Sequence, residues 1–226
     1  MPLYTADALI LRTYKLGEAD RIVVFLTRDR GKKRGVAKGA RRPRSRFAAA
    51  LEPMTEVRLA YFEKERRELV GLNYAETVRS PLTLALQGPP EGGLYRSASA
   101  EVLGHIGYFA ELLDEWAQEA DADERLYRLG ASMLDALSAG APVEPLARYF
   151  EYWLLRLQGV YQTPPDLSYE ARAFLETARA SSPMALAQVS VSRRVLAELE
   201  AVHQAQIALH LEKDLKSVRV LREMRR

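Results

Sequence analysis

The sequence predicts a two-domain protein of the β + α class, with a small antiparallel β-barrel over residues 1–80 and an all-helical domain over residues 81–226. Short apolar runs rich in β-branched residues occupy the first part, whereas apolar residues recur at steps of three and four in the second. The period changes around Pro81 and the turn-rich stretch 88–93. We therefore place the domain boundary near residues 80–93.

Five strands are expected in the first domain. They are predicted over residues 8–13, 21–27, 32–39, 54–62 and 68–78. A polar turn over residues 16–20 follows the first strand, and Gly31 marks a tight turn before the third. Residues 40–46 contain Pro43 and four arginines, which excludes a central strand and predicts an exposed loop. Five short strands in a domain of this size are typical of the oligonucleotide-binding (OB) barrel.

Amphipathic helices are expected throughout the second domain. The apolar stripes predict helices near residues 102–116, 126–137, 142–157, 169–179 and 191–211. Gly140 and Gly159 end the second and third of these helices, and a Ser-Ser-Pro turn ending at Pro183 separates the last two.

Positive charge is concentrated in one stretch of the chain. The whole protein has 33 Lys and Arg against 30 Asp and Glu, a net charge of +3. Residues 28–46 alone hold ten cations against one carboxylate, Asp29, so the rest of the chain is net acidic. Strand alternation places Lys32, Arg34 and Lys38 on one face. A local run of this kind suits a polyanion. The predicted nucleic-acid-binding residues are Arg28, Arg30, Lys32, Lys33, Arg34, Lys38, Arg41, Arg42, Arg44 and Arg46.

Aromatic residues of the predicted barrel would stack unpaired bases wherever they point outward. The candidates are Phe25, Phe47, Tyr61, Phe62 and Tyr74. We expect most of them in the barrel core and at most two exposed. From charge alone, the basic stretch is also compatible with a solvated loop or with a contact to a ribosome or a membrane surface.

Two further charge features lie in the helical domain. Residues 97–124 contain eight carboxylates and no Lys or Arg, and in the C-terminal residues 213–226 six cations outnumber two carboxylates. Both patterns are compatible with solvated helix faces. The alternative is that the acidic run binds a basic partner protein, and that Lys213, Lys216 and Arg219 form a second contact with DNA or an acidic peptide.

The sequence holds no recognisable catalytic constellation. The chain has no cysteine, no phosphate-binding Gly-rich loop ending in Gly-Lys-Ser/Thr and no G-x-S-x-G elbow. His105, His203 and His210 are scattered, without the spacing of a helical metal pair. We expect no enzyme activity, no metal and no cofactor. The N-terminus lacks a secretory leader and no run is long enough to span a membrane, so we expect a soluble, cytoplasmic protein.

Several motifs are shared with one bacterial family. Gly17, Glu18 and Asp20 form a G-E-x-D turn, and a strand ends in Leu26-Thr27-Arg28. Residues 36–47 then have the pattern V-A-K-G-A-R-R-P-x-S-R-F, and segments 148–159 and 210–221 extend the likeness. The chain resembles the RecO family of recombination mediators, most clearly in residues 1–80.

The resemblance implies an OB-fold and a helical domain in a non-enzymatic protein of DNA repair and homologous recombination. Such a protein binds single- and double-stranded DNA, anneals complementary strands and helps load recombinase onto DNA coated by the single-stranded DNA-binding protein SSB. The implied partners are DNA, RecR, the acidic C-terminal tail of SSB and, indirectly, RecA, in the nucleoid region of the cytoplasm. From the charge pattern we expect Arg41, Arg42, Arg44 and Arg46 to contact phosphate. Lys32, Arg34 and Lys38 are expected to follow the DNA backbone across the barrel.

One departure from the family concerns zinc. Many members carry a four-cysteine zinc module after the helix that corresponds to residues 148–159, whereas here residues 161–169 lead directly into the next helix without cysteine. We therefore expect the zinc module to be absent. Two rival hypotheses remain: an RNA-binding or translation-associated OB protein, and a scaffold whose helical domain does the binding.

Overall fold

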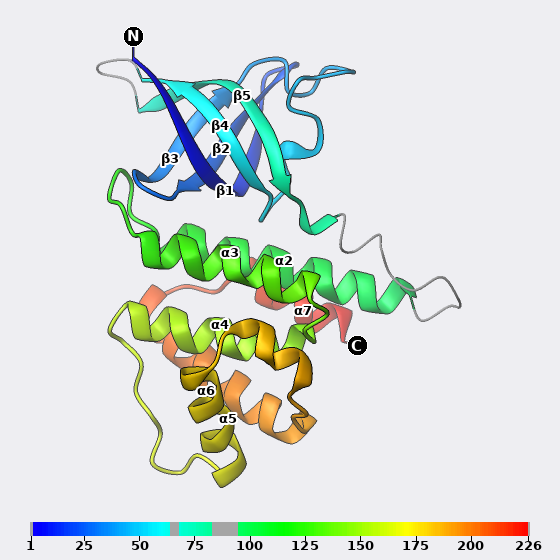
Figure 1. The fold of residues 1–226 in the computed structure, drawn as a ribbon, viewed down its shortest axis with the longest axis vertical. Helices are drawn as coiled ribbons and strands as arrows, with labels where there is room; N and C mark the ends of the chain where they lie inside the picture. The colour runs from blue at the N-terminus through cyan, green and yellow to red at the C-terminus, as the bar shows by residue number, and fades with distance from the viewer. Residues whose placement is uncertain (1, 64–67, 83–94, 226) are drawn as a thin grey trace. The chain divides into compact units, whose positions relative to one another are not determined.

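The computed structural model describes residues 2–63, 68–82 and 95–225. It confirms the predicted fold class, because a closed five-stranded barrel is followed by a series of helices (Figure 1). The strands are β1 (Leu3–Leu16), β2 (Asp20–Thr27), β3 (Gly31–Ala37), β4 (Glu56–Phe62) and β5 (Leu69–Arg79). The α-helices are α2 (Tyr95–Trp116), α3 (Glu124–Ser138), α4 (Val143–Leu157), α5 (Tyr169–Ala180), α6 (Arg193–Leu211) and α7 (Lys216–Met224). Short 3₁₀ helices span Ala48–Leu51 (η1) and Pro183–Gln188 (η2).

The strand order is that of an OB barrel. The strands follow one another as β1-β2-β3-β5-β4, and β4 pairs back with β1 to close the sheet. Every pairing is antiparallel except the short parallel contact of β3 with β5. The long strand β1 pairs with two strands, with β4 over Leu3–Leu9 and with β2 over Ala8–Leu16. A β-bulge between Ile10 and Arg12 lies in the second half and bends the strand.

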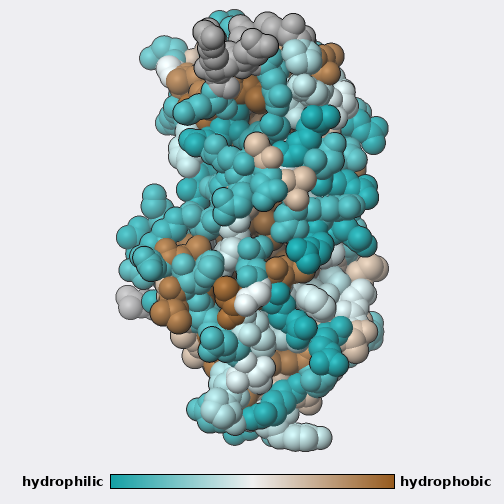
Figure 2. All heavy atoms as spheres, turned by 90° about the vertical axis from the view of Figure 1, so that its left-hand side faces the viewer, coloured by the Kyte–Doolittle hydropathy of each residue, from teal (hydrophilic) through white to brown (hydrophobic). Residues whose placement is uncertain are grey.

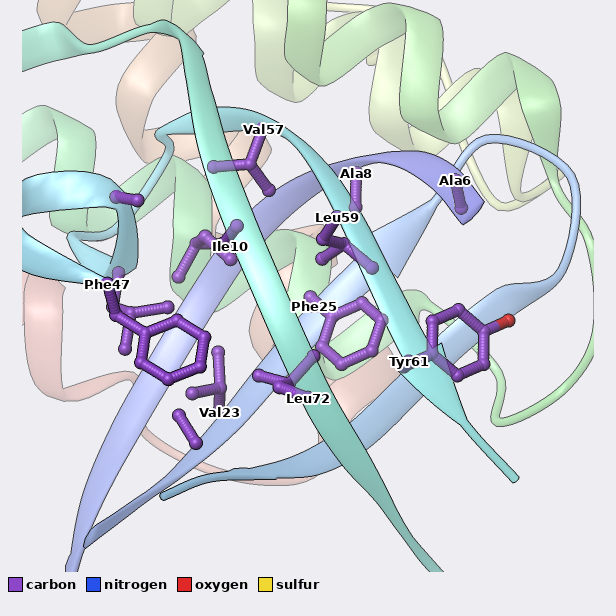
Figure 3. Packing of buried hydrophobic residues seen from close by; sticks show 14 of the residues in the cluster. Ala6, Ala8, Ile10, Val23, Phe25, Phe47, Val57, Leu59, Tyr61 and Leu72 are labelled. Carbon is purple, nitrogen blue, oxygen red and sulfur yellow. The ribbon is translucent and has the colours of Figure 1, made fainter. Parts of the chain in front are cut away.

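Aromatic residues fill the interior of the barrel. Phe25, Phe47 and Tyr61 point inward among aliphatic side chains from all five strands (Figure 3), and each is fully buried. On β3, Ala37 lies in this core, whereas Arg34 is exposed. Strand alternation therefore places Lys32 and Arg34 on the outer face of β3, whereas Lys33 has the parity of the core residue Ala37. Burial raises the pKa of Tyr61 to about 12.

The chain divides into two compact units. The first contains Met1–Pro90 with Ile106–Ala131, and the second contains Glu91–His105 with Ser132–Arg226. The unit that holds the barrel thus includes the last part of α2 and the first part of α3, which the sequence analysis assigned to the helical domain. The predicted boundary near residues 80–93 lies mostly outside the described residues and stays a prediction.

Charged residues are buried in the second unit at the helix that carries the family motif. Arg148 Nη2 lies 2.8 Å from Glu151 Oε1, and the other carboxylate oxygen of Glu151 lies 3.0 Å from His203 Nδ1. All three side chains are buried. Paired charges satisfy one another where water is excluded, so this part of the sequence motif has a structural explanation.

Helix α7 was not expected from the sequence, which shows only a basic tail there. None of the described helices has an apolar stretch long enough to cross a membrane. On the face drawn in Figure 2, hydrophilic residues predominate and hydrophobic residues form small separate groups.

Candidate nucleic-acid interface

The segment after β3, residues 38–46, forms an exposed loop that we call the basic loop. Its five cations, Lys38, Arg41, Arg42, Arg44 and Arg46, are all exposed. None of the five forms an ion pair with a carboxylate in the described part of the chain. Their charge is therefore available to an external anion.

The basic loop is held against the turn between β1 and β2. Arg41 N donates to Ala19 O at 2.9 Å, and Arg41 Nη1 donates to Gly17 O at 2.7 Å. Gly39 N donates to Asp20 Oδ1 at 2.8 Å. These three hydrogen bonds therefore attach the start of the loop to the β1–β2 hairpin.

The loop is built from tight turns and ends in the barrel core. Gly39 and Arg44 have φ angles of 71° and 60°, in the left-handed region. Ser45 N donates to Arg42 O at 3.1 Å, which closes a turn. Phe47 then enters the core, and the Arg46 guanidinium lies 5.1 Å from its ring centroid. Both ends of the loop are thus attached to the barrel, and the arginines project from a defined backbone.

Three cations that the sequence analysis placed in the same site are instead paired with carboxylates. We call residues 111–124 the acidic segment. Lys32 Nζ lies 3.3 Å from Asp114 Oδ1, Arg34 Nη2 lies 2.6 Å from Glu119 Oε1, and Arg28 Nη2 lies 2.8 Å from Glu124 Oε1. The hydrogen bond and charge of Glu119 raise the pKa of Arg34, and Glu124 does the same for Arg28. Part of the acidic run thus neutralises cations of its own unit.

Backbone contacts join the acidic segment to the first residues of β3. Lys32 N donates to Gln118 O at 3.1 Å, and Ala120 N donates to Lys32 O at 3.0 Å. Gly31, with φ of 68°, lies so close to the Asp121 backbone that a Cβ atom would overlap it. The acidic segment is therefore an additional pairing partner for the edge of β3.

The remaining two predicted cations contact aromatic rings. Arg30 Cζ lies 4.4 Å from the Tyr4 ring centroid, and Lys33 Nζ lies 5.8 Å from that of Tyr61. Lys33 Nζ also lies 2.6 Å from Glu63 Oε1. The ten predicted residues thus fall into three groups: five exposed cations on the basic loop, three cations paired with the acidic segment, and two beside tyrosines.

The aromatic candidates are mostly unavailable for base stacking. Phe25, Phe47 and Tyr61 are buried in the core, whereas Tyr74 is 38% exposed. Tyr14, which is 46% exposed near the end of β1, is not among the aromatic residues predicted from the sequence. The first strand is predicted to end at residue 13 and so excludes it, although strand alternation places the side chains of Arg12 and Tyr14 on one face.

Four basic residues of the C-terminal segment, together with Asp214, line a cavity of about 320 Å³ between α6 and α7. Lys213, Lys216 and Arg219 line it together with apolar residues that include Ile207 and Leu215. A cavity lined by both cations and apolar side chains is suited to an acidic peptide that carries an apolar residue.

A metal site is not found among the residues that the structure describes, which hold no cluster of three or more candidate ligands. His203 Nδ1 lies 3.0 Å from Glu151 Oε2, and the Nδ1 atom of buried His105 lies 2.9 Å from Glu101 O. Burial lowers the pKa of His105.

Two family models match the chain. The N-terminal model of recombination protein O matches residues 1–81, and the C-terminal model matches residues 98–182. The chain belongs to the recombination protein O family. The barrel, the basic loop and the acidic segment all lie within these matches, and the family resemblance noted in the sequence is confirmed.

Curated relatives support the same assignment. The chain is 37% identical to a DNA repair protein RecO of Koribacter versatilis, over 74% of this chain and 62% of the relative. It is 38% identical to that of Anaeromyxobacter sp. (strain K), over 67% of this chain and 55% of the relative. It is 40% identical to that of Bifidobacterium adolescentis, over 62% and 52%. The chain thus spans little more than half the length of these relatives.

Proposed function

We propose that this chain is a DNA repair protein that binds single- and double-stranded DNA through the basic loop. The observation that carries the proposal is a loop with five exposed cations, attached to an OB barrel and without ion-pairing carboxylates among the described residues. Cations of this kind neutralise phosphates and release counterions, which gives strong binding with little dependence on sequence. The family and the names of the relatives agree with this function.

The basic loop supplies most of the affinity in this proposal. A phosphate that approaches Lys32 or Arg34 must compete with Asp114 or Glu119, whereas Arg41 donates only to a backbone carbonyl. An ion pair that must be broken first subtracts from the free energy of binding. The strand cations therefore contribute less than the loop cations.

In this proposal, strand annealing and recombinase loading depend on contacts between flexible cationic side chains and DNA phosphates. Two complementary strands repel each other through their phosphates, and a protein that screens both strands lowers this cost while the bases stay free to pair. A recombination mediator acts on DNA that SSB already covers, so it needs contacts with both the DNA and that protein.

A salt titration of an arginine variant tests the DNA site. Substituting Arg41, Arg42, Arg44 and Arg46 together by Ala should reduce the slope of log affinity against log salt by about 3 for single-stranded DNA, at about 0.7 per phosphate contact. The matched control removes four exposed arginines elsewhere, namely Arg125, Arg128, Arg179 and Arg194. An unchanged slope in the loop variant, or an equal loss in the control, would refute the proposal.

The cavity between α6 and α7 is the proposed receptor for an acidic peptide such as the SSB tail. Its lining combines cations with apolar side chains, which suits a peptide with carboxylates and an aromatic end. Reversing Lys213, Lys216 and Arg219 to Glu should abolish binding of a fluorescent acidic, Phe-ended peptide. The same reversal at Arg179 and Arg194 should not. Contacts with RecR and RecA stay predictions from the family resemblance.

An RNA-binding protein of the same fold is the second candidate. The basic loop recognises phosphate, which both nucleic acids carry. Phosphate contacts do not distinguish ribose from deoxyribose. Titrations with single-stranded DNA and RNA of equal length separate the two functions. Tighter binding of RNA would favour the second.

A further inference from the structure

The β1–β2 hairpin carries exposed apolar side chains beside the basic loop. Tyr14 and Leu16, at the end of β1, are 46% and 37% exposed. Tyr14 pairs with Ile22 on β2, and Ile22 pairs with Val36 on β3. Directly paired residues point to the same face of a sheet, so Tyr14, Ile22 and Val36 form a continuous row, which we call the apolar strip.

The apolar strip lies between cations that are paired with carboxylates and cations that are not. Two residues before its members, Arg12 and Arg34 share the same outward face and are paired with the acidic segment. Two residues beyond Val36, Lys38 begins the basic loop. The strip is thus adjacent to the cations that remain available to phosphate, at a distance of about two residues, or about 7 Å, along the strand.

The ring of Tyr14 is held in place by a chain of contacts. Arg12 Nη1 donates a long hydrogen bond of 3.3 Å to Tyr14 Oη. Arg12 is itself fixed by carboxylates on α2, with Nε 3.3 Å from Asp114 Oδ2 and Nη2 3.7 Å from Glu111 Oε1. A side chain that is ordered before its ligand arrives loses less conformational entropy on binding.

We propose that Tyr14 is a stacking platform for an unpaired base of single-stranded DNA whose phosphates lie on the basic loop. The proposal rests on the DNA-binding function proposed above and adds a residue that neither the charge pattern nor the family match indicates. The Tyr14 ring offers an aromatic face, and Ile22 and Val36 provide half-buried apolar surface beside it. Stacking on an aromatic side chain tolerates any base, because every base has a π-face.

Stacking and charge neutralisation have different experimental signatures. A base in a duplex is already stacked and paired, so Tyr14 should contribute to single-stranded and not to double-stranded DNA. Stacking releases no counterions, so its loss should leave the salt slope unchanged. Loss of one stacked base should weaken binding of a single strand by about 5- to 150-fold, since stacking contributes about 1–3 kcal/mol.

The test compares Tyr14→Ala and Tyr14→Phe with the parent protein on oligothymidine and on a duplex of equal length, over a salt series. Tyr14→Ala should lose single-strand affinity with an unchanged salt slope and keep duplex affinity within twofold. Tyr14→Phe, which keeps the ring but loses the hydrogen bond from Arg12, should lose less affinity than Tyr14→Ala. Tyr169→Ala is the matched control, because Tyr169 is 84% exposed on α5. It should change neither affinity.

A fluorescent variant gives an independent measurement. Tyr14→Trp should bind oligothymidine, and the Trp emission assigned to position 14 by subtraction of the parent signal should be quenched on binding. Absence of quenching, an equal loss on both DNAs in Tyr14→Ala, or a loss in Tyr74→Ala instead would overturn the inference. DNA binding that depends on the loop arginines would remain in each of these cases, so the proposed function is tested separately.

Discussion

The ion pair between Arg34 and Glu119 predicts that removing one carboxylate strengthens DNA binding. Glu119→Gln leaves the size of the side chain unchanged and removes the charge that holds Arg34 Nη2 at 2.6 Å. The two side chains are 46% and 54% exposed, so the pair contributes only about 0.2–1 kcal/mol to stability, and the fold should tolerate the change. Asp114 is unsuitable for this test, because its side chain is 12% exposed and it contacts both Lys32 and Arg12.

The expected gain follows from the energy of the pair and from the phosphate that Arg34 can then neutralise. Affinity should rise by about 1.5- to 5-fold, which is the fold-change for 0.2–1 kcal/mol. The slope of log affinity against log salt should become steeper by about 0.7 on single strands and 0.9 on duplex DNA, corresponding to one additional contact. The increase in slope distinguishes a new phosphate contact from a general change in stability.

Fluorescence anisotropy over a salt series measures both quantities. Glu176→Gln is the matched control, because it gives the same change in net charge and disrupts an exposed pair with Arg179 on α5. An equal effect of the two substitutions would show that only net charge matters. An unchanged slope in Glu119→Gln would refute the idea that the acidic segment withholds Arg34 from DNA.

Three further predictions concern stability. Gly31→Ala should lower the free energy of unfolding in urea by at least about 2 kcal/mol, because a Cβ would overlap the acidic segment. Gly17→Ala is the control: Gly17 has a φ of 57° but no neighbour within 4 Å, so this change should show only the backbone cost of about 1–2 kcal/mol. Glu151→Gln should cost about 3 kcal/mol in the same assay, because it leaves Arg148 buried without its closest charge partner; a cost below 1 kcal/mol would contradict this. Burial lowers the pKa of His105, so as the pH falls through about 6.5 the unfolded state takes up a proton more readily than the folded state. The free energy of unfolding should therefore drop by up to about 1 kcal/mol between pH 6.5 and 5.5, and His105→Gln should remove this part of the pH dependence.

The sequence by itself determined the fold class, because its signals are local. Alternation of apolar residues, turn residues such as Gly31 and the later helical period each depend on neighbours in the chain. The outward orientation of Lys32 and Arg34 follows from the same alternation, and the exposed loop follows from Pro43 and its arginines. These features could be derived without knowledge of distant contacts.

Only the tertiary structure decided which of the ten cations are available. Lys32 and Asp114 are 82 residues apart in sequence, and Arg28 and Glu124 are 96 apart, so no local pattern shows that they pair. The bulge in β1 and the extension of that strand to Leu16 likewise depend on pairing with β2, and they make Tyr14 part of an outward row. Charge composition is a property of the chain, but the accessibility of each charge depends on what the fold brings beside it.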